Sequence, residues 1–290
     1  MPTKKKPKPL EGLFYGIFLT CGLVSIAFVL GITVYLVISG APAIAQIGLI
    51  PFLSGQIWSP STGNYGILPF ILTSVYGTVG AVAIGLPLGF LTALFLSKFA
   101  GKKVARLIRS AVELLAGIPS VVYGLVGMIV LVPAIQNTFG LSSGATLLAA
   151  IIVLAIMILP YITSVSATSL DAVPKEYEEG SLALGATDVE TYFKVSVHAA
   201  RSGIATAVMQ GVGRALGEAM AIIMVAGNVA NMPELLGSVR FLTTAIVSEM
   251  SYAPYGSLQR NALFSIGLVL FIFIVLVNVV LHLIARRKED

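Results

Sequence analysis

The chain has 290 residues and a formal net charge of +5, yet only 11% of its residues are charged while 57% are hydrophobic. A soluble globular domain carries about 25% charged residues, so this composition and the mean hydropathy of +0.96 exclude one. The basic excess does not indicate a nucleic-acid partner, because the cationic residues lie at the ends of apolar runs, where they orient a membrane protein.

Six apolar stretches are long enough to cross a hydrocarbon core of about 30 Å, which takes roughly 20 residues of helix. The predicted fold is therefore an all-α membrane protein with six transmembrane helices. The expected spans are 13–39, 68–97, 111–135, 145–169, 203–227 and 262–285. The first stretch is about twice as long as the apolar core of a signal peptide, so we expect it to be retained as a helix.

Most of the 18 Lys and Arg residues lie at the N-terminus, in the links 98–110 and 170–201, and in the C-terminal tail. With six spans these regions share one side, and the positive-inside rule makes that side cytoplasmic. We expect both termini there. The predicted layout is a basic N-terminus at 1–12, a first transmembrane helix at 13–39, an external loop at 40–67, a core at 68–285 and a cytoplasmic tail at 286–290.

Pro87, Pro119 and Pro160 lie well inside three of the expected spans. Proline removes a backbone donor and can kink a helix, although it is also commoner in membrane helices than in soluble ones. The cluster at 117–120, Gly-Ile-Pro-Ser, is followed by further glycines. It favours a close-packed or cavity-lining segment.

The link 170–201 is the most polar internal stretch, and its pattern predicts two short helices. Pro174 suits the first turn of a helix, and Gly185 suits a helix C-terminus. Thr187 with Glu190 three residues later matches a capping box, so a second helix follows a turn at Gly185–Ala186. The second helix has an apolar stripe formed by Val189, Tyr192, Phe193 and Val197. Either the link lies on the lipid headgroups, or this stripe docks to a partner.

An arginine, Arg214, lies near the midpoint of the expected span 203–227. An arginine at the centre of a membrane helix raises the free energy of membrane insertion by about 2.5–3.5 kcal/mol on insertion scales. Such a residue usually faces the interior of a helix bundle or a water-filled path. Glu218 is four residues later and should share its helix face. The two residues could be a structural ion pair, but a planar guanidinium also binds tetrahedral oxyanions in a bidentate manner. We therefore expect Arg214 to recognise an anion. We expect Glu218 to orient Arg214, to keep it from holding the anion too tightly, and to accept a proton from a partly protonated oxyanion.

Residues 179–185, Glu-Gly-Ser-Leu-Ala-Leu-Gly, resemble the EAA loop of ABC-importer permeases, although Val195-Ser196-Val197-His198 lacks the proline of the typical continuation. In that family the loop forms coupling helices that insert into a groove of a cytoplasmic ATPase. The resemblance places the coupling loop at 174–198. It implies ATPase coupling by Glu178, Glu179, Gly185, Ala186 and Thr187.

The segment 214–221, Arg-Ala-Leu-Gly-Glu-Ala-Met-Ala, resembles the PstC family of phosphate-importer permeases, as do residues 113–124 and 156–161. This resemblance implies a multi-pass protein of a prokaryotic plasma (inner) membrane. The implied partners are a PstA-like second permease, a PstB-like ATPase dimer that binds ATP and Mg, a PstS-like external binding protein, inorganic phosphate and membrane lipid.

The chain has no GxxxxGK[ST] loop, no nucleophile–base pair and no Cys/His cluster with metal spacing. We therefore expect a transport subunit without enzymatic activity, cofactor or metal of its own. Two alternatives stay open. One is a permease for another oxyanion or a phosphonate, and the other is a passive anion channel or sensor.

Overall fold

The computed structural model describes residues 9–286, with side chains described for 12–283. The N-terminal lysines on which part of the predicted orientation rests, and Arg287 and Lys288, lie outside these residues. The regular secondary-structure elements of the described chain are helices apart from one short antiparallel hairpin of β1 (Trp58–Ser59) and β2 (Asn64–Tyr65). The fold is therefore all-α, as the composition predicts.

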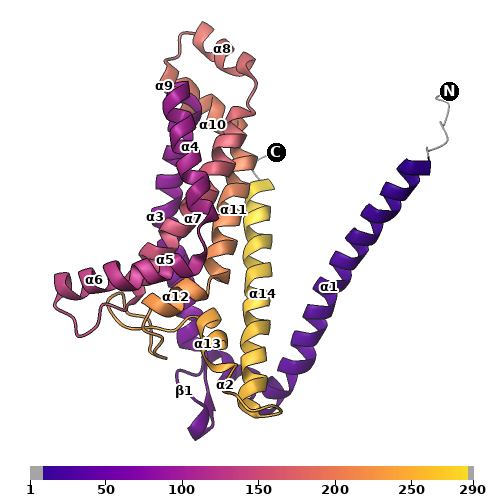
Figure 1. Cartoon of the computed structure of the whole chain (residues 1–290), viewed down its shortest axis with the longest axis vertical. Coiled ribbons are helices and arrows are strands. Elements are labelled where there is room, and N and C mark those ends of the chain that lie inside the picture. Colours follow the sequence, from indigo (N-terminus) through magenta and orange to yellow (C-terminus); the bar gives the residue numbers. More distant parts are fainter. Residues whose placement is uncertain (1–8, 287–290) are drawn as a thin grey trace.

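The described chain contains five helices that are long and apolar enough to cross a membrane. Their membrane-spanning segments are Gly12–Ile47, Leu68–Phe99, Ser120–Phe139, Leu147–Asp171 and Leu258–Leu283. They belong to α1 (Pro9–Ile47), α3 (Leu68–Leu94) with the π-helical turn η2 (Phe95–Phe99), the α5–α6 segment, α7 (Leu147–Asp171) and α14 (Leu258–Arg286). In Figure 1 the start of α1 and the end of α14 point toward the same end of the molecule as α8.

Two of the six expected spans are wrong in their boundaries. The expected helix 203–227 is broken into α11 (Arg201–Gly217) and α12 (Met220–Val225) by extended backbone at Glu218. The expected helix 111–135 is replaced by α4 (Lys102–Gly117) and a separate segment of α5 (Ser120–Val126), η3 (Gly127–Leu131) and α6 (Val132–Phe139). Ile118 precedes a proline, which disfavours the helical conformation, and its ψ of 128° is extended.

The expected external loop 40–67 is also more ordered than a loop. Helix α1 continues to Ile47, and α2 (Leu49–Ser54) and η1 (Pro60–Thr62) lie between it and α3. Prolines do not end the long helices, because α3 continues through Pro87 and α7 through Pro160. The remaining elements are α8 (Lys175–Ala183), α9 (Asp188–Thr191), η4 (Tyr192–Ser196), α10 (Val197–Ala199) and α13 (Leu242–Glu249).

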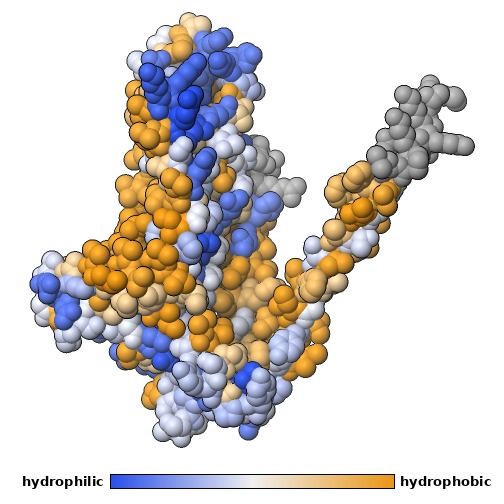
Figure 2. All heavy atoms as spheres, in the orientation of Figure 1, coloured by the Kyte–Doolittle hydropathy of each residue, from blue (hydrophilic) through white to orange (hydrophobic). Residues whose placement is uncertain are grey.

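The centre of the molecule is the pair α3 and α7, against which α11 packs. Small residues allow the close approach, since a methyl group at Gly85 would lie 2.8 Å from Ile158 Cγ1. One apolar cluster surrounds α7, and a second surrounds Phe52 and Phe70. A third, smaller one lies around Leu170. The end of the molecule with Phe52 and Phe70 is the one predicted to be external, and the end with Leu170 the one predicted to be cytoplasmic, and the two ends are named by these predictions below. Figure 2 shows a broad hydrophobic band between two more polar ends, as a membrane protein requires.

Helix α1 contacts the rest of the molecule mainly at its external end. There Tyr35 packs edge-on against Phe264 of α14, with 5.4 Å between ring centroids, and Ser265 Oγ donates to the carbonyl of Gly40 at 2.7 Å. Toward its N-terminus α1 diverges from the other helices (Figure 1). Its apolar side chains are exposed there, so they face lipid or another membrane protein.

Candidate functional site

Arg214 lies in the last turn of α11 and has no carboxylate partner. Its Nε is buried without a hydrogen bond, and the guanidinium makes no ion pair with any residue that the structure describes. The guanidinium lies over the ring of Tyr161 on α7, whose centroid is 4.8 Å from Arg214 Cζ. A cation over an aromatic face gains about 0.5–2 kcal/mol. Stacking on Tyr161 thus positions the guanidinium, and its N–H groups are not engaged in hydrogen bonds with described residues.

Glu218 forms no ion pair with Arg214 among the described residues. It directly follows Gly217, the last residue of α11, and its φ of −74° and ψ of 130° turn the chain after it out of the helix. The side chain is buried, with 8% exposed, and its Oε1 accepts from the backbone N–H of Ala221 at 3.0 Å. The carbonyl of Glu218 accepts from Thr243 Oγ1 at 2.7 Å. The carboxylate therefore stabilises a break in the helix.

A polar stripe follows α11 from its cytoplasmic end to the arginine, and sequence reasoning missed it. Ser202, Thr206 and Gln210 are exposed at intervals of four residues, and Gly217 continues the same face. The opposite face buries Ala207, Gly211 and Ala215. Figure 2 shows hydrophilic side chains between α4 and α14, where α11 lies. Polar side chains on an exposed membrane face indicate water or a partner subunit rather than lipid. The signal was the spacing of these residues in the sequence.

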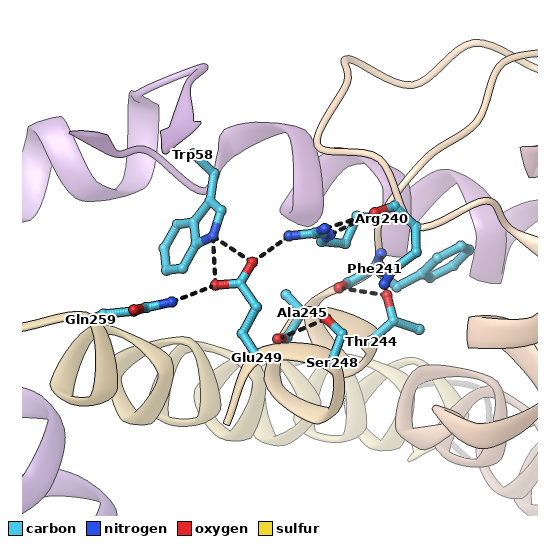
Figure 3. A network of polar contacts seen from close by, with 9 residues as sticks. Trp58, Arg240, Phe241, Thr244, Ala245, Ser248, Glu249 and Gln259 are labelled. Carbon is cyan, nitrogen blue, oxygen red and sulfur yellow. Dashed lines mark hydrogen bonds and ion pairs between the residues drawn. The ribbon is translucent and has the colours of Figure 1, made fainter. Parts of the chain in front are cut away.

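A second charged cluster lies at the external end, centred on Glu249 at the end of α13 (Figure 3). Trp58 Nε1 donates to both carboxylate oxygens at 2.9 and 3.1 Å, and Gln259 Nε2 donates to Oε2 at 3.1 Å. Arg240 forms an ion pair with Glu249 and donates from Nε and Nη2 to the carbonyl of Asn228 at 2.9 and 2.7 Å. The cluster joins the hairpin, the segment after α12, α13 and α14.

The external link 228–261 thus has an ordered core, which the sequence analysis did not predict. The signal available was Arg240 and Glu249, which are two of the four charged residues in an otherwise mildly apolar stretch. Helix α13 connects this core to the helix break, because Thr243 near its start bonds Glu218 and Glu249 is its last residue.

The cytoplasmic link contains the two predicted helices, α8 and α9, joined at Gly185 with φ +88°. The predicted capping box is present, since Thr187 Oγ1 accepts from the Glu190 N–H and the Glu190 carboxylate accepts from the Thr187 N–H. This backbone hydrogen bond, helped by Lys194, lowers the pKa of Glu190. The tip of the link is apolar and open, with Leu184 91% exposed.

The predicted apolar stripe of the second helix is divided. Val189 and Phe193 are exposed, whereas Tyr192 and Val197 pack on the cytoplasmic apolar cluster. Burial raises the pKa of Tyr192. The outward half of the stripe and Leu184 together form an exposed apolar surface on the link predicted to be the coupling loop.

The residues predicted to couple to an ATPase are divided in the same way. Glu179 and Gly185 are exposed, Thr187 is engaged in the capping box and Ala186 is half-buried. Glu178 faces the body of the protein, where it forms an ion pair with Lys98 and accepts from Ser196 Oγ at 2.7 Å. Within the described residues, no group of three or more His, Cys, Asp or Glu side chains could hold a metal ion.

Comparison with known proteins bears on this arrangement. Residues 85–290 match the family described as binding-protein-dependent transport system inner membrane component. The chain is 42% identical over 277 residues to the probable ABC transporter permease protein YqgH of Bacillus subtilis, covering 92% of this chain and 89% of that protein. It is 34% identical over 302 residues to the phosphate transport system permease protein PstC of Haemophilus influenzae, covering 97% and 95%.

Solved structures agree in fold. A bacterial ABC transporter involved in the import of the acidic polysaccharide alginate superposes with a TM-score of 0.66 at 14% identity, covering 97% of each chain. The MetNI methionine ABC transporter in an inward-facing conformation superposes with a TM-score of 0.57 at 22% identity, covering 77% of this chain and 94% of that chain. At these identities the likeness concerns the fold alone.

Proposed function

Because the chain belongs to the inner membrane components of binding-protein-dependent transport systems, we propose that it is the permease subunit for inorganic phosphate in an ATP-driven importer. Membership of the family makes it a multi-pass, non-catalytic membrane subunit with the fold of type I importer permeases. ATP is bound by a partner ATPase, and an external binding protein delivers the solute. The proposal concerns the solute and the residues that handle it.

The observation that carries this proposal is the unpaired guanidinium of Arg214 beside the helix break. An arginine whose Nε is buried without a partner incurs a desolvation cost that a ligand can offset. A planar fork suits two oxygens of a tetrahedral oxyanion. The polar stripe on α11 gives that face a route toward the cytoplasmic end. Relatives with PstC in their names support phosphate as the oxyanion.

Glu218 has a revised role in this proposal. Its Oε1 is bonded to the Ala221 N–H, but its Oε2 makes no hydrogen bond with any described residue. Phosphate at neutral pH carries a proton that it can donate to this oxygen, whereas sulfate is fully ionised and would be repelled. Arg214 would then supply attraction for any oxyanion, and Glu218 would select a protonated one.

The proposed partners follow from the two ends of the molecule. The exposed tip of the coupling loop, with Glu179, Leu184 and Gly185, would meet a PstB-like ATPase dimer. The external end would meet a PstS-like binding protein, and a PstA-like permease would complete the path. ATP binding would draw the ATPase subunits together and move the loop, which would switch the access of Arg214 from one side to the other.

The test is phosphate uptake by vesicles that contain the complete complex. Arg214→Lys keeps the charge but loses the fork, so we expect at least a tenfold loss of uptake. Glu218→Gln should retain uptake but lose discrimination between phosphate and sulfate. Competition by sulfate, molybdate and phosphonate checks the solute. Normal uptake by Arg214→Ala at normal protein levels would refute the proposed site, and uptake without ATP would indicate a passive channel.

A further inference from the structure

Three consecutive residues of the π-helical turn η2, which continues α3, contact three different elements. Ser97 Oγ donates to Asp171 Oδ1, at the end of α7, at 2.6 Å. Lys98 forms an ion pair with Glu178 of α8. Phe99 packs edge-on against Tyr192 of η4, with 5.2 Å between ring centroids. The π-helical turn η2 thus connects the coupling loop to the helical core.

The pair Lys98–Glu178 is enclosed, unlike a surface ion pair. The side chains are only 10% and 18% exposed, and Glu178 Oε1 also accepts from Ser196 Oγ at 2.7 Å. Removing such charges from water costs free energy that apolar packing would avoid. By contrast, Lys194–Glu190 on the same loop is 74% and 49% exposed and is expected to contribute little. The enclosed ion pair fixes the position of α8 relative to α3, whereas apolar contact alone would allow the two helices to shift along each other.

The position that it fixes is that of α8 relative to α3. Helix α3 packs along α7 and α11, and Thr163 Oγ1 of α7 donates to the carbonyl of Gly89 at 3.2 Å. Because protein interiors are close-packed, a displacement of the end of α3 also displaces or strains the helices packed beside it. One of these helices, α11, carries Arg214.

We propose that Lys98 and Glu178 are positioning residues that transmit movement of the coupling loop to α3, and that Glu178 does not contact the ATPase. The inference rests on the proposed coupling of this loop to an ATPase. Adjacent glutamates then have different roles, because Glu179 is on the exposed surface and Glu178 is turned inward. When the ATPase displaces the loop, the ion pair between Lys98 and Glu178 displaces the end of α3 with it.

The experiment uses the assembled complex in vesicles, with Glu178→Gln and Lys98→Met compared with Glu179→Gln. We expect the first two to retain the ATPase subunit on co-purification while phosphate transported per ATP hydrolysed falls at least tenfold. Glu179→Gln should instead weaken retention of the ATPase. The exchanged pair Lys98→Glu with Glu178→Lys should restore the ratio to within about threefold of wild type. Loss of the ATPase from Glu178→Gln, or an unchanged ratio in both single variants, would overturn the inference.

A second readout does not depend on which solute is carried. In a Cys21→Ser background, Gln210→Cys on the polar stripe reports access to α11 by its rate of thiol labelling. We expect ATP to change this rate in the wild-type complex and not in Glu178→Gln or Lys98→Met. If phosphate uptake were absent from the wild type but the labelling change were present and lost in these variants, the solute would be wrong and the transmission pair right. An ATP-dependent change that survives in both variants would overturn the pair.

Discussion

Arg240 and Arg214, two arginines in the second half of the chain, differ in what their guanidinium groups touch. Arg240 donates from Nε and Nη2 to the carbonyl of Asn228 and pairs through Nη1 with Glu249 (Figure 3). Arg214 has no hydrogen bond or ion pair among the described residues and stacks on Tyr161. A saturated guanidinium stabilises the fold, because its donors are already paired. A guanidinium in a membrane helix whose donors are not paired can instead donate them to a bound ligand.

The surroundings of the two arginines sharpen this contrast. Arg240 belongs to a cluster that gathers four segments of the external end, and its carboxylate partner is shared with Trp58 and Gln259. Arg214 lies beside a break in the helix, and the expected partner, Glu218, forms no ion pair with it among the described residues. One arginine is therefore expected to affect stability and the other transport, which can be tested separately.

The largest effect is expected for Arg214→Gln. Losing a bidentate charged contact removes interactions of about 1.5–3 kcal/mol each, so phosphate uptake by the complex should fall about a hundredfold or more. The melting temperature should fall only slightly, because the stacking on Tyr161 is lost but no internal hydrogen bond is. Uptake kinetics and thermal unfolding of the same preparation measure both. A large drop in melting temperature with normal uptake per folded complex would reverse the roles of the two arginines.

Arg240→Gln should show the opposite profile. The substitution leaves the Glu249 carboxylate without its cation and the Asn228 carbonyl with fewer donors. Because the cluster is partly exposed, we expect about 1–3 kcal/mol of destabilisation rather than the 3–5 kcal/mol of a fully buried pair. Uptake per folded complex should stay within about threefold of wild type. Denaturant unfolding measures the first quantity and vesicle uptake the second; normal stability would contradict the structural role.

A smaller effect is expected at Tyr161, on which Arg214 is stacked. Tyr161→Leu removes the aromatic face, and a loss of about 0.5–2 kcal/mol of cation–π energy corresponds to roughly 2- to 30-fold weaker apparent affinity for phosphate. Tyr161→Phe keeps the ring and is the matched control. The apparent affinity in uptake assays should separate the two variants. Equal weakening in both would mean that the hydroxyl group, and not stacking, matters.

How much of this could be predicted depended on whether the signal was local. The capping box at Thr187 and the turn at Gly185 were predicted correctly, because both are set by residues within one turn. The break at Glu218 was not, since the apolar pattern runs through it and the bond from Thr243 that stabilises the extended backbone comes from a distant segment. The inward turn of Glu178 depends on Lys98, far away in the chain. Such partners cannot be identified from helical spacing.

The smallest effect is expected for Trp58→Phe. The indole N–H bonds Glu249, but the carboxylate keeps Arg240 and Gln259, so the loss should be that of one charged hydrogen bond partly compensated by water. We expect about 0.5–1.5 kcal/mol of destabilisation and no change in apparent affinity for phosphate. The phenylalanine can keep the packing on Tyr65 and Phe70. Denaturant unfolding and uptake measure the two quantities. If Trp58→Phe instead changed affinity as Tyr161→Leu does, the external cluster would belong to the transport path, and saturation of a guanidinium would no longer distinguish a structural arginine from a transporting one.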